Sequence, residues 1–145
     1  MNLQRGFVAK ALAGLEQVAR ELEKYRDTTA EMLATNLSLR WTVERGLLVG
    51  LGLIFQIADH ILARAFQRSV DTYEGLLLEL KAVSVISEEL YRRLKGSGGF
   101  RNILVHEYIK VDLKEVTSVL RDAPDTFRAF CDEVLTWLKI FPEEG

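Results

Sequence analysis

The apolar residues of this chain recur every three or four positions over most of its length, which is the spacing of one face of an α-helix. The N-terminal stretch shows the pattern most clearly, with Leu3, Phe7, Ala11, Leu15, Val18, Leu22 and Tyr25. Alternation of apolar and polar residues, which is typical of half-buried strands, is absent. The pattern therefore predicts an all-α fold.

Three long helices are expected. The first covers the N-terminal stretch, the second begins after a cap at Asn36 or Ser38 and runs past Leu62, and the third follows Asp112. Shorter helices are expected over residues 71–81 and after Ser87. Pro124 should kink or split the last helix, because proline removes a backbone N–H donor. Together these segments predict an antiparallel up-and-down helical bundle, with three long helices and two or three short ones, in a single domain over residues 1–145.

Three glycines lie inside the second long helix, at positions 46, 50 and 52. Glycine in a helix costs roughly 1 kcal/mol relative to alanine. Close approach of a neighbouring helix would compensate for that cost. The neighbour belongs either to the same chain or to a second subunit.

Several classes of protein are disfavoured by the sequence. The longest apolar run, over residues 46–58, is shorter than the ~20 residues of a membrane-spanning helix, and no signal peptide is visible. Cys131 is the only cysteine, so a cytoplasmic protein without disulfides is expected. The sequence has no glycine-rich phosphate loop, no Cys/His cluster and no serine-hydrolase elbow, so neither a metal nor a cofactor is expected.

A basic segment lies between Tyr91 and Lys114. It contains six basic residues and two acidic ones, for a local charge of +4, whereas the whole chain has a net charge of −2. Such a patch can attract phosphate, and the candidates for RNA contact are Arg92, Arg93, Lys95 and Lys110. The alternative is an ordinary solvated helix surface.

Inside the basic segment, Arg101, Asn102 and His106 form a set that suits cleavage of a phosphodiester. A neutral imidazole can take a proton from a ribose 2′-hydroxyl, and an arginine can hold the non-bridging phosphate oxygens. Asparagine can bind the phosphate or fix the imidazole. None of these steps requires a metal. The alternative is a structural histidine that satisfies a carbonyl group.

Helical geometry limits how these side chains can meet. At about 100° per residue, Asn102 and His106 share a face, whereas Arg101 lies about 140° from His106. Arg101 and Tyr108, seven residues apart, share another face. One regular helix therefore cannot direct all four side chains at one phosphate. Either the helix begins after Arg101, with the glycine-rich stretch 96–99 acting as a flexible hinge, or two subunits share a site. We favour dimerisation.

The segment Arg-Asn-Ile-Leu-Val-His-Glu-Tyr over residues 101–108 resembles the signature of HepT-like HEPN proteins, which is an arginine, four residues, a histidine, any residue and a tyrosine. The similarity extends upstream to Glu44-Arg45, to the segment 57–62 and to Tyr73-Glu74. It covers most of the chain from about residue 40 onward.

The resemblance implies a metal-independent endoribonuclease that works as a homodimer and is the toxin of a toxin–antitoxin pair. In such proteins the partner is a minimal nucleotidyltransferase antitoxin, which silences the toxin by transferring AMP to the motif tyrosine, here Tyr108. Arg101 and His106 would be catalytic and Asn102 supporting. Asp59 and His60 match a polar position in relatives, where they either support the site or form a buried polar pair.

Two other functions fit the same sequence. One is a non-catalytic subunit that uses the same basic cleft to hold a nucleotide or RNA beside a nucleotidyltransferase. The other is a plain structural helical protein.

Overall fold

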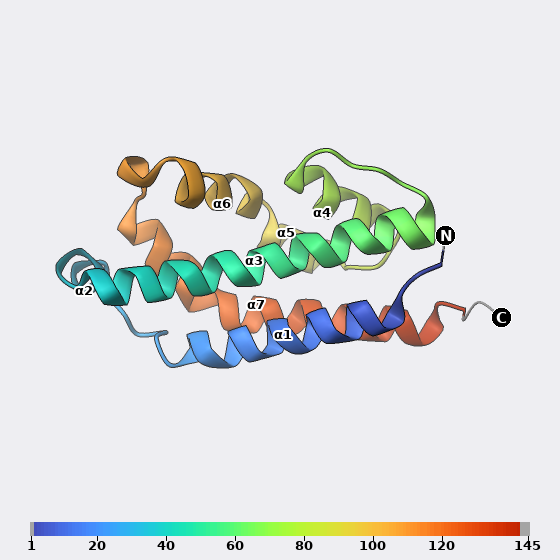
Figure 1. Cartoon of the computed structure of the whole chain (residues 1–145), viewed down its shortest axis with the longest axis horizontal. Helices are drawn as coiled ribbons and strands as arrows, with labels where there is room; N and C mark the ends of the chain where they lie inside the picture. The colour runs from blue at the N-terminus through green and yellow to red at the C-terminus, as the bar shows by residue number, and fades with distance from the viewer. Residues whose placement is uncertain (1, 143–145) are drawn as a thin grey trace.

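The computed structural model describes residues 2–142, and these residues form helices without any strand (Figure 1). The all-α expectation is therefore confirmed. In chain order the elements are α1 (Arg5–Glu23), α2 (Ala30–Thr35), α3 (Leu37–Phe66), α4 (Tyr73–Ala82), α5 (Glu88–Leu94), α6 (Ser97–His106), the 3₁₀ turn η1 (Tyr108–Lys110) and α7 (Leu113–Ile140). The described part thus has three long helices, as expected, and four short ones.

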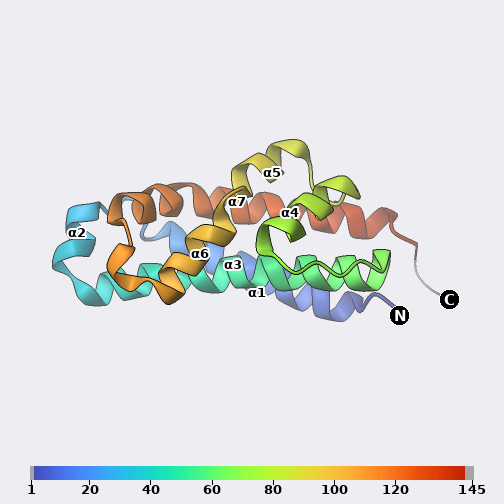
Figure 2. The same ribbon diagram turned by 90° about the horizontal axis from the view of Figure 1, so that it is seen from above.

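The three long helices lie side by side, with α1 antiparallel to both α3 and α7 (Figures 1 and 2). The helices α3 and α7 run in the same direction, because α4, α5 and α6 together lead the chain back between them. The bundle therefore keeps its up-and-down order, but its third segment consists of the short helices α4, α5 and α6 instead of one long helix. These short helices carry the residues singled out in the sequence.

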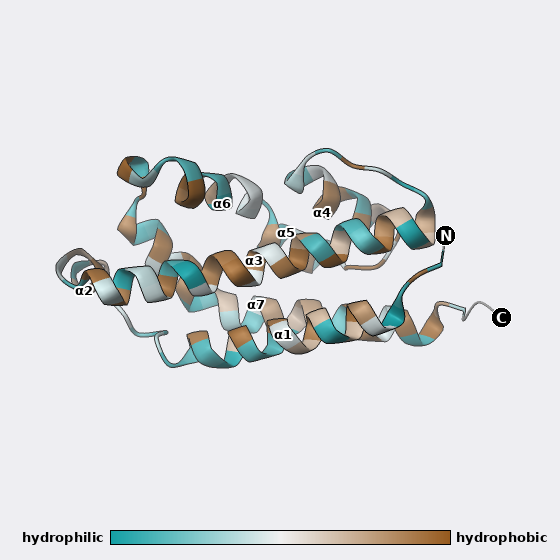
Figure 3. Cartoon of the chain, viewed as in Figure 1, coloured by the Kyte–Doolittle hydropathy of each residue, from teal (hydrophilic) through white to brown (hydrophobic). Residues whose placement is uncertain are grey.

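Buried apolar side chains from all the α-helices form one cluster, with contributions such as Leu15 from α1, Ile54 from α3 and Phe130 from α7. Hydrophobic residues are densest in the middle of α3 (Figure 3). By length and composition α3 could cross a membrane, but half of its most apolar window is buried inside the protein. The apolar run 46–58 is only part of this 30-residue helix, so the shortness of the run does not by itself exclude a membrane span. Its burial is what a central bundle helix requires.

Two of the three glycines in α3 are explained by contacts within the chain. A Cβ atom at Gly46 would lie 2.7 Å from Cδ2 of Leu22 in α1, and one at Gly50 would overlap the ring of Phe127 in α7. Gly52 is different, because a Cβ atom there would meet nothing within 4 Å. The neighbour of Gly46 and Gly50 is therefore the same chain, whereas Gly52 faces open space.

Side-chain caps start most of the helices at the expected places. Asn36, rather than Ser38, caps α3 by accepting a hydrogen bond from the Leu39 N–H at 3.1 Å. Ser87 caps α5, and Asp112 caps α7 by accepting from the Lys114 N–H at 2.9 Å. These residues satisfy backbone donors that have no partner inside a helix.

Pro124 does not split the last helix, because α7 continues through it from Leu113 to Ile140. Proline has no N–H, so the carbonyl of Leu120, four residues earlier, lacks its helical donor. A side chain from outside the helix contacts the neighbouring carbonyl. The Nε–H of Arg26 donates to the Arg121 carbonyl at 3.1 Å, and the same guanidinium pairs with Asp125 at 2.9 Å. Arg26 lies in the turn after α1, and its two contacts hold this turn against α7 on both sides of the proline.

The two ends of the fold are joined directly. The Arg5 guanidinium, at the start of α1, donates to the carbonyls of Leu138 at 2.9 Å and Phe141 at 2.6 Å, at the end of α7. Carbonyls in the last turn of a helix lack internal donors, so a cation is favourable there. The first helix therefore caps the last.

Candidate functional site

Helix α6 begins earlier than the sequence indicates. Only Gly96 lies outside the helix, in a left-handed conformation with φ of 89°, and Ser97, Gly98 and Gly99 form the first turn of α6. The expectation of a flexible glycine hinge over residues 96–99 is therefore wrong. The Glu74 carboxylate of α4 accepts hydrogen bonds from the N–H groups of Gly96 and Gly98, each at 2.9 Å, and so supplies the acceptors that this turn needs.

Arg101 is the fifth residue of α6 and is partly buried. Its guanidinium carbon lies 5.0 Å from the centre of the Tyr73 ring. The side chain lines a cavity of about 310 Å³ between α3, α4 and α6, together with Gln56, Asp59 and Asp71. Because Arg101 is inside the helix, the alternative in which the helix begins after it is excluded.

Asn102 and His106 lie one turn apart on the exposed side of α6, and His106 is the last residue of the helix. Within residues 2–142 neither side chain forms a hydrogen bond or an ion pair with the protein. The helical spacing keeps His106 about 140° from Arg101 around the axis. A single chain therefore presents the arginine and the histidine in different directions.

Tyr108 is in the 3₁₀ turn η1 directly after α6, and its residue is 46% exposed. The guanidinium carbon of Arg40, in α3, lies 4.2 Å from the centre of the tyrosine ring. The Arg40 Nε–H in turn donates to the buried Glu44 carboxylate at 3.0 Å. Sequence reasoning missed Arg40, although its spacing of four residues from Glu44 on a helix is a signal for an ion pair.

The four basic residues considered for RNA contact fall into two groups. Arg92 pairs with Glu88 at 3.2 Å, and Lys110 pairs with Glu107 at 3.0 Å. Arg93 and Lys95 form no ion pair within the described part of the chain.

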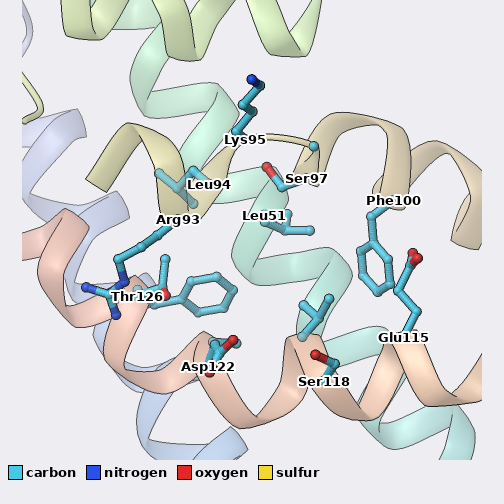
Figure 4. A pocket seen from close by; sticks show the side chains of 14 residues that line it. Leu51, Arg93, Leu94, Lys95, Ser97, Phe100, Glu115, Ser118, Asp122 and Thr126 are labelled. Carbon is cyan, nitrogen blue, oxygen red and sulfur yellow. The ribbon is translucent and has the colours of Figure 1, made fainter. Parts of the chain in front are cut away.

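Arg93 and Lys95 line a second cavity, of about 320 Å³, with Glu115 and Asp122 opposite them on α7. Figure 4 shows Lys95 extending away from the other lining side chains. The Ser97 hydroxyl also lines this cavity, and it is buried without a hydrogen-bond partner among residues 2–142. The cavity therefore carries both signs of charge.

Asp59 and His60 point to different parts of the protein. Asp59 is exposed and lines the cavity beside Arg101. The His60 Nε2 accepts a hydrogen bond from the Gln4 backbone N–H at 3.1 Å, and its ring lies 4.8 Å from that of Phe7. Burial lowers the pKa of His60, as does Arg64, while Asp59 has a smaller opposing effect. The two residues therefore do not form a buried polar pair.

No group of three or more His, Cys, Asp or Glu side chains that could hold a metal ion occurs among the residues described. The lone cysteine, Cys131, is buried in α7. Burial, with a smaller contribution from Glu16 and Asp132, raises the pKa of its thiol to about 12.

Comparison with known proteins gives consistent matches over nearly the whole chain. The family model described as Ribonuclease HepT-like matches residues 15–134. The chain is also 25% identical over 144 residues to the tRNA nuclease HepT of Aphanizomenon flos-aquae, covering 99% of this chain and 98% of that protein.

Solved structures show the same fold. The cytosolic protein YutE of Bacillus subtilis, whose function is unknown, superposes with a TM-score of 0.83 at 16% identity, over 99% of each chain. A tri-AMPylated HEPN toxin of Shewanella oneidensis, in complex with its MNT antitoxin, superposes with a TM-score of 0.79 at 20% identity, over 90% of this chain and 97% of the toxin. The match of the family model to most of the sequence shows that this chain belongs to the HepT-like ribonucleases of the HEPN family.

Proposed function

We propose that this protein is an endoribonuclease toxin that cuts RNA without a metal ion, with Arg101 and His106 as its catalytic residues. Family membership supports nuclease activity in general. The observation that best supports these catalytic roles is that both side chains on α6 are accessible and have no carboxylate partner among the described residues. Arg101 lines an open cavity and His106 is exposed at the helix end, and within residues 2–142 no carboxylate forms an ion pair with either of them.

The chemistry follows from these two side chains. Neutral His106 takes the proton of a ribose 2′-hydroxyl, whose oxygen attacks the adjacent phosphorus. The 5′-oxygen leaves and takes up a proton, so the products are a 2′,3′-cyclic phosphate and a 5′-hydroxyl end. Arg101 holds the non-bridging oxygens while their charge develops. Asn102 supports the phosphate or the imidazole from the His106 face.

A homodimer would bring the two catalytic groups together. Because Arg101 and His106 diverge around α6, a site that uses both requires Arg101 from one subunit and His106 from the other. The basic residues Arg92, Arg93, Lys95 and Lys110 would bind RNA phosphates around this site. Arg93 and Lys95 should contribute most to RNA affinity, because Arg92 and Lys110 already have carboxylate partners.

Regulation by a minimal nucleotidyltransferase antitoxin completes the proposal. The Tyr108 hydroxyl would attack the α-phosphorus of ATP, releasing pyrophosphate and a proton and leaving AMP on the tyrosine. The added group would bring bulk and negative charge to the place where RNA phosphate binds. Support comes from the half-exposed position of Tyr108 two residues after His106, and from the AMPylated state of the S. oneidensis toxin.

The test is to incubate the protein with total RNA and with tRNA in EDTA, beside Arg101→Ala and His106→Ala. Mass spectrometry must first show that Tyr108 is unmodified. We expect cleavage by the parent alone, with cyclic phosphate ends. A folded, unmodified parent that cuts no RNA would overturn the nuclease and favour an accessory subunit that binds a nucleotide or RNA.

A further inference from the structure

We infer that Tyr73 and Glu74, in the first turn of α4, are positioning residues that orient Arg101, an inference that rests on the proposed role of Arg101 in catalysis. Neither residue needs to touch the substrate. They act by fixing the direction of the guanidinium and the position of the helix that carries it.

Tyr73 provides the surface on which the guanidinium lies. Its ring stacks on that of Phe55 in α3, with centroids 4.4 Å apart and an angle of 21° between the planes. Phe55 is buried in the core, so the Tyr73 ring has a rigid support. Arg101 lies on the same ring at 5.0 Å. A planar guanidinium is attracted to an aromatic face, and this contact restricts its rotamers.

A ring suits this purpose better than a carboxylate. A carboxylate would occupy the N–H donors of the guanidinium, whereas a ring below its plane leaves those donors free for a phosphate. Asp59 and Asp71 line the same cavity, yet neither forms an ion pair with Arg101 in the described part of the chain. The arrangement therefore holds the arginine while leaving its donors available.

Glu74 fixes the helix itself. Its two carboxylate oxygens accept from the N–H groups of Gly96 and Gly98 at 2.9 Å, at the end of α6 where negative charge is favourable. A Cβ atom at Gly98 would lie 2.7 Å from Cβ of Tyr73, so α6 touches α4 at this point. Residues three apart on a helix are neighbours, so contact at Gly98 directs Arg101 to the same side. The first turn of α4 thus sets the rotation of α6.

The kinetic test compares Tyr73→Phe and Tyr73→Leu. Phenylalanine keeps the ring and should retain nearly parental activity. Leucine should lower kcat by about 10- to 100-fold with little change in KM, because misplacement of a catalytic group by about 1 Å has effects of this size. Tyr91→Leu is the matched control, since Tyr91 also lies under a cation, Lys81, at 4.4 Å but belongs to α5. Equal kcat for Tyr73→Leu and Tyr91→Leu would overturn the role of Tyr73.

A second pair of variants tests the Glu74 carboxylate in the same way. Glu74→Gln keeps the size of the side chain but removes the charge, and it should lower kcat more than Glu133→Gln. Glu133 is a matched control because its carboxylate also lies at a helix start, accepting from the Ser87 N–H at 2.6 Å and hydroxyl at 3.0 Å. Equal rates in the two variants, with equal thermal stability, would exclude a specific role for Glu74.

A spectroscopic readout separates this inference from the nuclease proposal. In ¹⁵N-arginine-labelled protein, the Nε–H resonance assigned by its loss in Arg101→Lys should carry a ring-current shift. The shift should persist in Tyr91→Leu and disappear in Tyr73→Leu. An unchanged resonance in Tyr73→Leu overturns the positioning. If the parent cuts no RNA but the shift behaves as expected, the nuclease proposal fails while the contact between Tyr73 and Arg101 stands.

Discussion

At the scale of single residues, Glu44 is unusual because it is a carboxylate with only 8% of its residue surface exposed. Burial of a charge is costly unless a partner compensates for it. Arg40 is that partner, and it also covers the Tyr108 ring. The environment of the proposed modification site is therefore tied to one ion pair inside the bundle.

Arg40→Ala should lower the free energy of unfolding by about 1–3 kcal/mol, because it leaves a buried acceptor without its donor. Urea denaturation measures the change. Arg92→Ala is the control, since its pair with Glu88 is exposed and should barely affect stability. Equal losses of unfolding free energy in the two variants would show that the Arg40–Glu44 pair stabilises the fold no more than an exposed ion pair does.

His60 should make stability depend on pH. Its pKa lies below the ordinary 6.5, chiefly because of burial and secondarily because of Arg64, so the folded state resists protonation more than the unfolded chain. Neutral His60 therefore contributes to the free energy of unfolding above pH 6.5, and this contribution is lost as pH falls through the lowered pKa. We expect the urea midpoint of the parent to fall more steeply below pH 6.5 than that of His60→Gln. Parallel pH profiles for the two proteins would contradict this assignment.

At the scale of elements, the long helices could be predicted from the sequence and the short ones only in part. Periodic apolar residues located α1, α3 and α7, and local caps such as Ser87 located the start of α5. α2 is a six-residue helix, too short for a period to show. The start of α6 could not be predicted, because Ser97-Gly98-Gly99 forms helix poorly by propensity and is held there by Glu74 from a distant part of the chain.

The candidate site could also be predicted only in part from the sequence. Arg101, Asn102, His106 and Tyr108 could be selected from their spacing and chemistry, and their catalytic roles stay predictions. Tyr73 was selected only by the resemblance, and Arg40 was missed despite its spacing from Glu44. The contacts of these two residues with Arg101 and Tyr108 could not be predicted, because a ring under a guanidinium joins two helices and leaves no local pattern. The ion pair of Arg92 with Glu88 has the i,i+4 spacing that the sequence shows, whereas that of Lys110 with Glu107 depends on the 3₁₀ turn η1, which the sequence did not predict.

Two neighbouring glycines of α6 should respond in opposite ways to alanine. Gly99→Ala should maintain or raise stability, by up to about 1 kcal/mol, because a Cβ atom there meets nothing within 4 Å and alanine favours helix. Gly98→Ala should lower stability, because its Cβ atom would lie 2.7 Å from Cβ of Tyr73. Thermal melts of both variants measure the difference. A stabilised Gly98→Ala would mean that α6 does not touch α4 as described.

At the scale of the whole molecule, the described chain leaves two surfaces uncovered. One is the face of α3 at Gly52, and the other is the side of α6 that carries His106. The glycine lines the same cavity as Arg101. In the proposed homodimer, a second copy of the chain would cover this face of α3, and its His106 would lie near Arg101 of the first copy.

Complementation between inactive variants tests such a shared site. Arg101→Ala and His106→Ala, co-expressed in equal amounts, should recover about a quarter of the parental nuclease rate. Half of the dimers would then be mixed, and each mixed dimer would have one complete site. Recovery is measured against each variant alone. If each site used both residues of one subunit, the mixture would stay inactive.

The contact of Arg5 with the end of α7 has a consequence for how the protein is made. Helix α7 packs against α1 and contributes core residues such as Phe127 and Phe130, so the bundle cannot close until the last helix has been synthesised. The segment with Arg101 and His106 leaves the ribosome earlier, before its supporting core exists. Under the proposed function, this segment would gain its supporting contacts, and with them its activity, only once α7 has packed against α1.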